Sequence, residues 1–568
     1  MRVLGIWDGH DAGAALIEEG RVVFAANEER YTKKKLDVSF PYNSIIAALY
    51  HSGLKPGDIE HIAFSTTDFS KTLERIFPAL KYNYYSFRRR KVRRPRFEHI
   101  RHSIKYSMTS VGKVPLSAAI SRSIISRHLR KMGFGRFKLY VVDHHVAHAA
   151  SAAFTSGFSR SLIITLDGLG DGLSGSISTF ENGKLERLAS IRARDSIGIL
   201  YEQVTNALGM RELEDEGKIM AMADYSYPFD FEDNKLKDLV RVRGTSLIGK
   251  YNPRKQYNIV RDVAWQTPRE QVAYMAQQLL ENIVIKLTSN AIDRFGIRDI
   301  AFAGGVFSNV KANMKVRSLE TVKRWYVFPH MGDGGLALGA ALYANNMIEG
   351  LDDCEFNAYL GDDYNADDTK HVLKSDRSLE IHEESIGEQA RHAAELLSNG
   401  DYLFWFQDRM EYGPRALGHR SILAPPGDLQ AKDKLNLYVK RREWFQPFAS
   451  SILEQDFGRL VDYDEKGFDP YMTNAYLVKE DAQLHMASVV NVDKTTRPQA
   501  VPNDSGAYSS LLKSLKRHTG FGVVLNTSFN LHGFPIVRDP EDAMRTMKET
   551  KTKYMFINGI TVRNRKVV

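Results

Sequence analysis

The sequence predicts an α/β protein with two domains, of which the first is internally duplicated. A chain of 568 residues is longer than one hydrophobic core normally serves, so it should divide. Two segments, beginning at Arg2 and at Ser161, show the same succession of strand, Asp-Gly turn, strand, Gly turn and strand. After an acidic stretch over Leu351–Asp376, strands and helices alternate anew. We therefore expect a first domain over 1–350, a linker over 351–378 and a second domain over 379–568.

The individual elements follow from short apolar runs bounded by turn residues. In the first repeat we predict strands at Arg2–Trp7, Ala12–Glu18, Arg21–Ala26, His61–Ser65 and Lys138–Val142, and helices at Tyr42–His51 and His144–Phe154. In the second repeat we predict strands at Ser161–Leu166, Gly175–Glu181 and Asp299–Ala303, and helices at Gly198–Leu208 and Arg269–Arg294. In the second domain, Asp401–Phe406 is predicted as a strand and Ala431–Tyr438 as a helix.

A basic insertion over 66–137 carries most of the excess charge. The chain has 78 basic and 69 acidic residues, a net charge of +9, and Arg88–Lys105 alone carries +8. Aromatic residues are interleaved with these cations, a pattern that suits stacking on bases and pairing with phosphates. The predicted partner is polyanionic: a nucleotide, RNA, DNA or a lipid-linked molecule at an acidic membrane. A solvated insertion that binds nothing fits the pattern as well.

The remaining composition excludes several classes of protein. Cys354 is the only cysteine, which rules out an internal disulfide, a CxxC redox pair and a multi-cysteine metal site. No run of about 20 apolar residues is present, so we expect no transmembrane helix. The N-terminus reaches Asp8 before an apolar signal core is complete. A cytoplasmic protein is the resulting expectation.

Asp-Gly turns end the first strand of each repeat, at Asp8-Gly9 and Asp167-Gly168. Because glycine has no Cβ, its backbone amide can approach a phosphate closely, while the neighbouring carboxylate faces a cation. Glycines after later strands extend the set, and the predicted nucleotide-binding glycines are Gly168, Gly304, Gly305 and Gly334. An actin-like ATPase fold binds ATP and its Mg²⁺ in this way. A series of plain tight turns is the alternative.

His144 and His148 stand four residues apart in a predicted helix, which places both imidazoles on one face. Asp167 and Asp333 can complete a nitrogen–oxygen ligand set with them. With no thiolate in the set, the chemistry suits iron(II), zinc or manganese. An alanine-rich helix can also bury such a pair of histidines without a metal.

Three polar clusters in the second domain favour a pocket for a small phosphate. Arg415 and Arg420 lie five residues apart among glycines, a spacing that suits capture of a phosphate or carboxylate. Lys440 and Arg442 add positive charge beside aromatic residues, and the hydroxyl- and amide-bearing run Leu525–Asn530 follows an apolar strand. Each cluster alone fits a solvated polar loop equally well.

Several of these motifs resemble the NodU/CmcH/TobZ carbamoyltransferases. The matching runs are His144–Ala153, Leu166–Gly168, Gly198–Tyr201, Gly217–Met220 and Ala303–Asn309. The resemblance covers the chain apart from residues 66–137. It implies an actin-like first domain similar to TsaD, the tRNA threonylcarbamoyl-adenosine enzyme, and an α+β second domain similar to YrdC. It also implies a metal, held by His144, His148, Asp167 and Asp333, that contacts an adenylate bordered by Gly304, Gly305 and Asn309.

The resemblance assigns further roles. Lys440-x-Arg442, Arg497 and Ser528-x-Asn530 match the residues with which YrdC-like domains hold carbamoyl groups and phosphate. Gln446 and Ser450 stand where the family commonly has arginine and proline, so one anion contact is lost. His10 is the expected general base, because an imidazole transfers protons near neutral pH and Asp11 can orient it. Lys35 is expected near the adenylate. A histidine that caps its turn and a solvated lysine run are the alternatives.

Together these features predict an ATP-dependent carbamoyltransferase. Carbamoyl phosphate would be converted through carbamoyl-adenylate, with a divalent metal as Lewis acid, and the carbamoyl group would pass to a hydroxyl or amine acceptor. One alternative is a threonylcarbamoyl-type transfer to tRNA. Another is a nucleotide- or nucleic-acid-binding regulator without enzymatic activity. The acceptor, the metal and the oligomeric state, a homodimer included, stay open.

Overall fold

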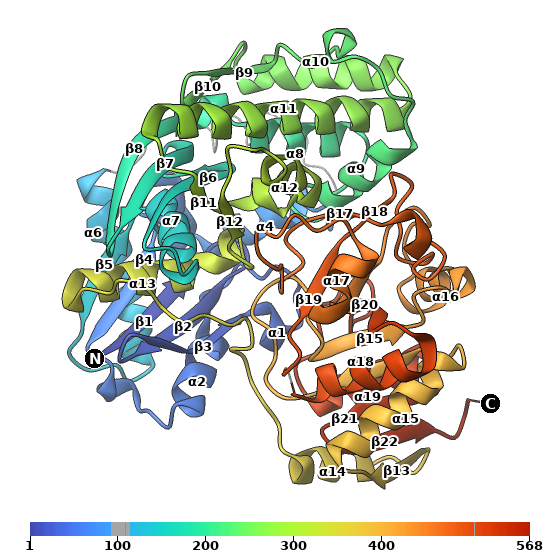
Figure 1. The fold of residues 1–568 in the computed structure, drawn as a ribbon. Helices are drawn as coiled ribbons and strands as arrows, with labels where there is room; N and C mark the ends of the chain where they lie inside the picture. The colour runs from blue at the N-terminus through green and yellow to red at the C-terminus, as the bar shows by residue number, and fades with distance from the viewer. Residues whose placement is uncertain (93–107, 109–113, 505, 568) are drawn as a thin grey trace. The chain divides into compact units, whose positions relative to one another are not determined.

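Short apolar strands build two sheets with the same strand order in the first half of the chain. The computed structural model describes residues 1–92, 108, 114–504 and 506–567, so the basic run predicted over Arg88–Lys105 lies outside the described residues from position 93 onward. The first sheet has the order β3-β2-β1-β4-β5 (Figure 1). Its strands are β1 (Arg2–Trp7), β2 (Gly13–Glu18), β3 (Arg21–Asn27), β4 (His61–Ser65) and β5 (Lys138–Val142).

The second sheet repeats this topology, with the order β8-β7-β6-β11-β12. In the first sheet β1 pairs antiparallel with β2 and parallel with β4; in the second, β6 pairs antiparallel with β7 and parallel with β11. The predicted repeat of strands and turns therefore exists as two equivalent sheets, and the predicted α/β class is confirmed. The strands are β6 (Arg160–Gly170), β7 (Leu173–Glu181), β8 (Lys184–Arg192), β11 (Asp299–Ala303) and β12 (Arg324–Val327).

Two helices, α7 (His144–Thr155) and α13 (Leu336–Glu349), pack against each other between these sheets. Helix α13 covers β1, β2 and β4, and α7 covers β6 and β11. Glycine permits the close approach: a Cβ on Gly5 would lie 2.0 Å from the carbonyl oxygen of Ala337, and one on Gly339 would lie 1.9 Å from that of Ala147. The two sheets and the two helices thus form one layered core.

Further helices surround this core. The part of the insertion that the structure describes contains α3 (Phe69–Ile76), α4 (Pro78–Arg88) and α6 (Pro115–Lys131). The others are α2 (Tyr42–His51), α8 (Ile197–Ala207), α9 (Glu216–Met222), α10 (Pro253–Gln266), α11 (Arg269–Phe295) and α12 (Val310–Arg317), with a hairpin of β9 (Val240–Arg243) and β10 (Ser246–Gly249).

By their internal contacts, residues Met1–Glu28 and Leu36–Phe356 form one unit, and Glu29–Lys35 and Asn357–Val568 form a second. The second unit is built on a sheet with the order β13-β22-β21-β14-β15-β20-β16-β19. Its strands are β13 (Leu379–Glu383), β14 (Leu403–Phe406), β15 (Arg420–Ala424), β16 (Ala449–Leu453), β19 (Pro498–Val501), β20 (Val523–Ser528), β21 (Tyr554–Ile557) and β22 (Ile560–Asn564). A separate pair is formed by β17 (Tyr476–Leu477) and β18 (Thr495–Thr496).

The central strand β14 is apolar at every position because both faces of this sheet are buried. Phe404 and Phe406 belong to one core, whereas Leu403 and Trp405 belong to another, as the alternation of a strand requires. The helices of the unit are α1 (Glu29–Thr32), α14 (Ala366–Lys374), α15 (Ile386–Ser398), α16 (Leu429–Lys434), α17 (Glu454–Leu460), α18 (Gly506–Thr519) and α19 (Pro540–Thr550).

Candidate functional site

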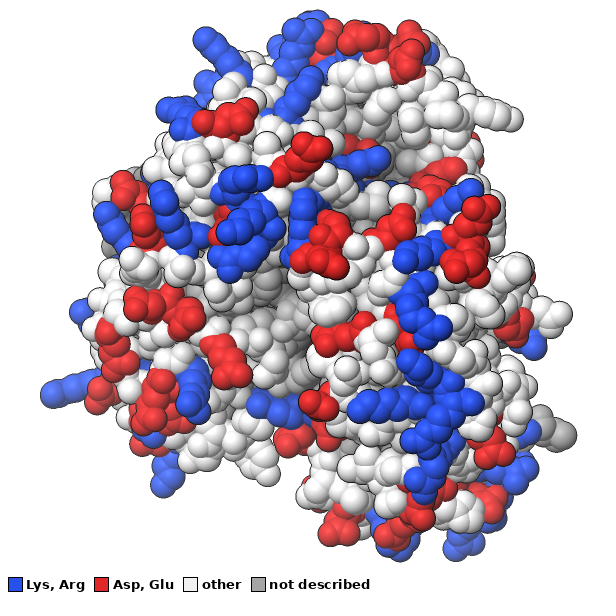
Figure 2. Space-filling model, viewed as in Figure 1, with Lys and Arg blue, Asp and Glu red and all other residues white. Residues whose placement is uncertain are grey.

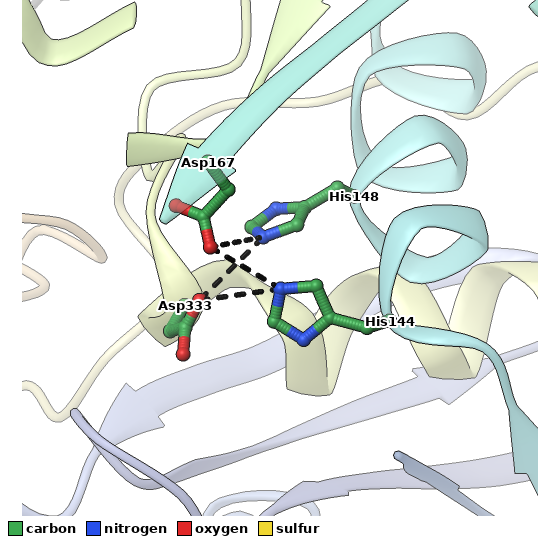
Figure 3. Close-up of side chains that lie close together, drawn as sticks. All are labelled: His144, His148, Asp167 and Asp333. Carbon is green, nitrogen blue, oxygen red and sulfur yellow. Dashed lines mark hydrogen bonds and ion pairs between the residues drawn. The ribbon is translucent and has the colours of Figure 1, made fainter. Parts of the chain in front are cut away.

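Four side chains of the first unit meet around one point. The Asp143 side chain accepts hydrogen bonds from the amides of His145 and Val146, and so starts α7 at His144. The spacing of four residues then sets the rings of His144 and His148 4.8 Å apart. Figure 3 shows Asp167, from β6, and Asp333, from the turn before α13, facing both rings. One ligand atom from each of the four residues lies within 4.8 Å of the others.

The charges of this group favour a bound cation. Burial alone would lower the pKa of His144, but Asp333 and Asp167 raise it to about 9. Burial opposes the ionisation of Asp167, yet the two histidines hold its pKa far below the usual range. The Nε2 atom of His148 is buried and makes no hydrogen bond. Carboxylate oxygens and imidazole nitrogens are ligands that divalent transition metals accept. A bound cation would also compensate the negative charge of the two partly buried carboxylates.

The neighbouring His145 does not join this group. Its Nδ1 lies 2.9 Å from the hydroxyl oxygen of Thr165, and burial together with the charge on His144 lowers its pKa to about 3. It is therefore a neutral, buried histidine that fixes α7 to β6.

The predicted glycines stand where chain segments cross. Gly304 has φ +103° and its Cβ would lie 2.1 Å from the Leu166 carbonyl oxygen. The amide of Gly305 donates to Asp167 Oδ1 at 2.8 Å. A Cβ on Gly334 would lie 2.4 Å from Asp11 Oδ2, and one on Gly168 would lie 3.2 Å from Glu202 Oε1. These four glycines lie in three backbone segments, each next to an aspartate of the His/Asp cluster.

Asn309 has a defined position beside these glycines. Its side-chain oxygen caps α12 by accepting from the amide of Ala312 at 3.0 Å, and its amide donates to Gln277 at 2.7 Å. Both ends of the side chain are therefore engaged in holding the start of α12.

His10 lies in the turn between β1 and β2. Its ring stacks on Tyr85 of α4, with ring centroids 5.7 Å apart, and its carbonyl accepts from Trp7 Nε1 at 2.7 Å. The Trp7 ring in turn meets the edge of His144 at 6.0 Å. Asp11, which we expected to orient His10, lies 3.7 Å from His330 Nε2. The turn is thus tied to both the His/Asp cluster and the insertion.

A buried charge cluster in the insertion escaped the sequence analysis. Arg75 donates twice to the carboxylate of Asp8, each time at 2.8 Å, and Lys71 and Lys81 donate to the Asp8 carbonyl. Burial would raise the pKa of Asp8, but Arg75, Lys71 and Lys81 outweigh it and hold the pKa well below the usual range. The same burial, with the charge on Lys71, lowers the pKa of Lys81 to about 7. The i, i+4 spacing of Lys71 and Arg75 is the only local signal for it.

The first residues of the predicted polyanion patch are buried inside the protein. Arg88 pairs with Glu202 and Glu212, and Arg89 donates to the Leu36 carbonyl oxygen at 2.8 Å. Lys91 Nζ lies 3.2 Å from Glu214 Oε1. The prediction that this run is surface charge from Arg88 onward is therefore wrong at Arg88 and Arg89, because acidic residues more than a hundred positions away neutralise them.

The second unit contains a cluster of cations at the predicted phosphate pocket. A π-helical turn over Leu435–Val439, where a regular helix was predicted, leads into Lys440. Lys440 Nζ donates to Ser528 Oγ at 3.0 Å and to Asn530 Oδ1 at 2.5 Å. Arg442 donates from Nε to Asn436 Oδ1 at 2.6 Å and stacks on Phe448 at 4.2 Å. The KxR and SxN motifs are thus in direct contact.

Arg415 and Arg497 complete this cluster. Each has a buried Nε atom, and neither forms a hydrogen bond or an ion pair with another residue of the described chain. Burial lowers the pKa of Arg497 well below the usual range, and repulsion from Arg415 and Arg442 lowers it further. Burial also lowers the pKa of Arg415 to about 10. A concentration of positive charge without acidic partners is what a small anion would neutralise.

Three further residues singled out in the sequence, Arg420, Lys35 and Gln446, also belong to the second unit. Arg420 donates to the carbonyl oxygens of Gln407 and Asp408, at 2.6 and 3.0 Å, so its terminal nitrogens hold the loop that carries Arg415. Lys35, expected at the adenylate, belongs to the second unit. Its charge acts together with burial and with Arg442 to lower the pKa of Lys440. Gln446 donates to Glu443.

Comparison with known proteins assigns the family. Residues 2–342 match the carbamoyltransferase N-terminus and residues 394–564 match the carbamoyltransferase C-terminus. The protein therefore belongs to the carbamoyltransferase family and is an enzyme of that family, which confirms the resemblance inferred from the sequence motifs.

Individual relatives agree with this assignment. An uncharacterized protein of Methanocaldococcus jannaschii is 36% identical over 78% of this chain and 76% of its own length. Nodulation protein NolNO of Sinorhizobium fredii is 30% identical over 98% of this chain and 79% of its own. The 3'-hydroxymethylcephem-O-carbamoyltransferase of Amycolatopsis lactamdurans is 28% identical over 57% and 60%. Among the described residues, no helix has the length and apolar character needed to cross a bilayer.

Proposed function

We propose that the protein is an ATP-dependent carbamoyltransferase that uses carbamoyl phosphate and forms carbamoyl-adenylate. The second unit would release carbamate and phosphate from carbamoyl phosphate and water. The first unit would join carbamate to the α-phosphate of ATP, with loss of pyrophosphate, and then pass the carbamoyl group to a hydroxyl or amine acceptor, with loss of AMP. Carbamate decomposes quickly in water, which explains the advantage of holding both activities in one chain.

The observation that carries this proposal is the cluster of Lys440, Arg442, Arg415 and Arg497. Within the described residues these cations form no ion pair, and burial together with repulsion from Arg415 and Arg442 lowers the pKa of Arg497. A dianionic acyl phosphate such as carbamoyl phosphate would offset this positive charge, and the charge that develops on the leaving phosphate would be stabilised most. The hydrogen bonds from Lys440 to Ser528 and Asn530 leave a hydroxyl and an amide beside that charge for the carbamoyl group.

In the first unit, the glycine backbones and His10 have separate roles. Gly304, Gly305 and Gly334 would border the nucleotide phosphates, with the amides of Gly304 and Gly305 held by Met331 and Asp167. His144, His148, Asp167 and Asp333 would hold a divalent metal, iron(II) in preference to zinc or manganese, which when bound supplies Lewis-acid stabilisation of phosphate charge. His10, positioned by Trp7 and Tyr85, would take the proton of the acceptor as its oxygen or nitrogen attacks the carbamoyl carbon.

The test measures pyrophosphate released from ATP by the purified protein. We expect release only when carbamoyl phosphate is also present, and loss of release in Lys440→Met and Arg497→Met variants. Addition of a cell extract should yield a product heavier by one carbamoyl group in mass spectrometry. Release that requires threonine and bicarbonate instead would support the tRNA-directed alternative. Absence of release with either donor would contradict the proposal.

A further inference from the structure

The basic character of the chain extends beyond the run found in the sequence, into a helix that the structure describes. Residues 75–142 contain 18 basic residues and a single acidic one, Glu98, a net charge of +17 that leaves the rest of the chain at −8. Elsewhere the two signs are mixed, as the face drawn in Figure 2 shows. Part of this imbalance serves the fold, because Arg75, Arg88 and Lys91 pair with acidic residues from other segments, and the remaining excess indicates a polyanionic partner.

Helix α6 presents part of this charge to solvent. Its exposed cations are Arg122, Arg127, Arg130 and Lys131, and Arg136 and Lys138 follow it. Within the described part of the chain none of these cations forms an ion pair, in contrast to Arg88 and Lys91. Arg122 donates to the carbonyl of Leu139 and Lys138 lies over the Tyr140 ring, so these contacts leave their charges uncompensated.

Large apolar side chains are exposed on α6, on α3, which packs against α6, and on α4, which packs against α3. Helix α3 is joined to α6 by the hydroxyls of Thr72 and Ser121, 2.8 Å apart. The exposed fractions are 68% for Leu116 on α6, 43% for Phe69 and 40% for Ile76 on α3, 63% for Leu80 on α4, and 52% for Phe77 between α3 and α4. We call these five residues and the four exposed cations of α6 the α3/α4/α6 surface. It combines aliphatic and aromatic side chains with uncompensated cations.

We propose that the α3/α4/α6 surface binds an anionic lipid bilayer. Transfer of aliphatic side chains from water to the acyl boundary of a bilayer is favourable, and so is pairing of cations with lipid phosphates and carboxylates. The α3/α4/α6 surface has both kinds of side chain. A nucleic acid would pair its phosphates with the cations but would offer no favourable contact to exposed leucine and isoleucine side chains. Bilayer binding would bring the enzyme to a membrane-associated acceptor. The proposal rests on surface composition alone and does not depend on the reaction proposed above.

The experiment uses the full-length protein and sedimentation with phosphatidylcholine vesicles, with or without about one third phosphatidylserine. We expect binding only to the anionic vesicles, weakened when salt rises from about 0.1 M to about 0.5 M. An R127Q/R130Q/K131Q variant should bind roughly 100-fold more weakly, about fivefold for each cation removed. An L80S/L116S variant should bind at least about tenfold more weakly, because two exposed leucines no longer insert.

The control is R254Q/K255Q/R261Q, which removes three exposed cations from α10 and should leave vesicle binding unchanged. All three variants should keep the melting temperature and the turnover of carbamoyl phosphate, because none of the changed residues contacts the clusters described above. No binding of the wild-type protein to anionic vesicles would overturn the proposal. The proposal would also be overturned if the wild-type protein bound single-stranded RNA and the L80S/L116S variant kept both this RNA binding and its full vesicle binding. A change of oligomeric state in R127Q/R130Q/K131Q that accounts for its loss of vesicle binding would overturn it as well.

Discussion

Replacing Arg415 by methionine should stabilise the protein without substrate and strongly reduce its stabilisation by phosphate. Arg415 forms no hydrogen bond or ion pair within the described chain, and its Nε atom is buried. Methionine keeps the apolar stem but removes a charge that burial disfavours. The Arg415→Met substitution therefore separates the free-energy cost of burying this cation without a ligand from the stabilisation gained when an anion neutralises it.

The magnitude follows from the electrostatics of the site. Burial lowers the pKa of Arg415 to about 10, well below that of a free arginine, which corresponds to ~3 kcal/mol of disfavoured charge. Because the folded-state pKa is depressed, this cost is fully present below pH 10 and so at pH 7. The side chain as a whole is only half-buried, and solvent screening reduces the expected gain to ~1–2 kcal/mol. For a unit of this size that is roughly 2–8 °C in melting temperature.

The assay is a thermal melt at pH 7 with and without about 100 Kd of inorganic phosphate. Wild-type protein should gain ~2.7 kcal/mol from that concentration, and Arg415→Met far less. Arg420→Met is the matched control, because burial lowers the pKa of Arg420 to about 10 as well. Its guanidinium satisfies the carbonyls of Gln407 and Asp408, so its loss should destabilise by ~2–4 kcal/mol. Destabilisation of both variants, with equal gains from phosphate, would refute the reasoning.

Three other predictions follow from the first unit. A His144→Ala/His148→Ala variant should lose at least about 90% of its bound transition metal by elemental analysis, since two ligands of four are removed; full metal content would contradict the metal assignment. Asp8→Asn should lower the free energy of unfolding by ~3–5 kcal/mol in urea, because Arg75 and Lys71 lose their buried counter-charge, whereas Asp58→Asn on the surface should change it little. Burial lowers the pKa of Lys81 to about 7, so its charge destabilises the fold below pH 7 and this cost is relieved as the pH rises towards about 10. The stability of wild-type protein relative to Lys81→Met should therefore increase from pH 7 to pH 9; a constant difference would show that Lys81 stays charged in the folded protein throughout this range.

Residues whose roles depend on local spacing could be predicted from the sequence. The four-residue interval of His144 and His148 determines that their rings share one face of a helix, and the Asp-Gly turns mark the ends of β1 and β6. The repeat of strand and turn signals is likewise local, and it appears as two sheets with the same order. The KxR and SxN motifs could be found by resemblance, and Lys440 does contact Ser528 and Asn530.

Roles that depend on distant partners could not be predicted in this way. Arg88 looked like surface charge because Glu202 and Glu212, which neutralise it, lie 114 and 124 positions further along the chain. Arg415 and Arg420 looked like an equivalent pair, although only Arg420 reaches the carbonyls of Gln407 and Asp408. Lys35 follows the strands of the first unit in sequence but belongs to the second.

The sequence by itself thus determined the α/β class, the duplicated strand order and the residue types of both clusters, because strand alternation, helical spacing and turn preferences act between near neighbours. Only the tertiary structure decided which cations are neutralised and which are left for a ligand or a surface. The free energy of a buried charge depends on the groups that the fold places around it, and these groups come from far along the chain. The cations behind the net charge of +9 are therefore of two kinds with different functions. Some, such as Arg75 and Arg88, pair with acidic residues inside the fold, whereas others, such as Arg127 and Arg415, are uncompensated.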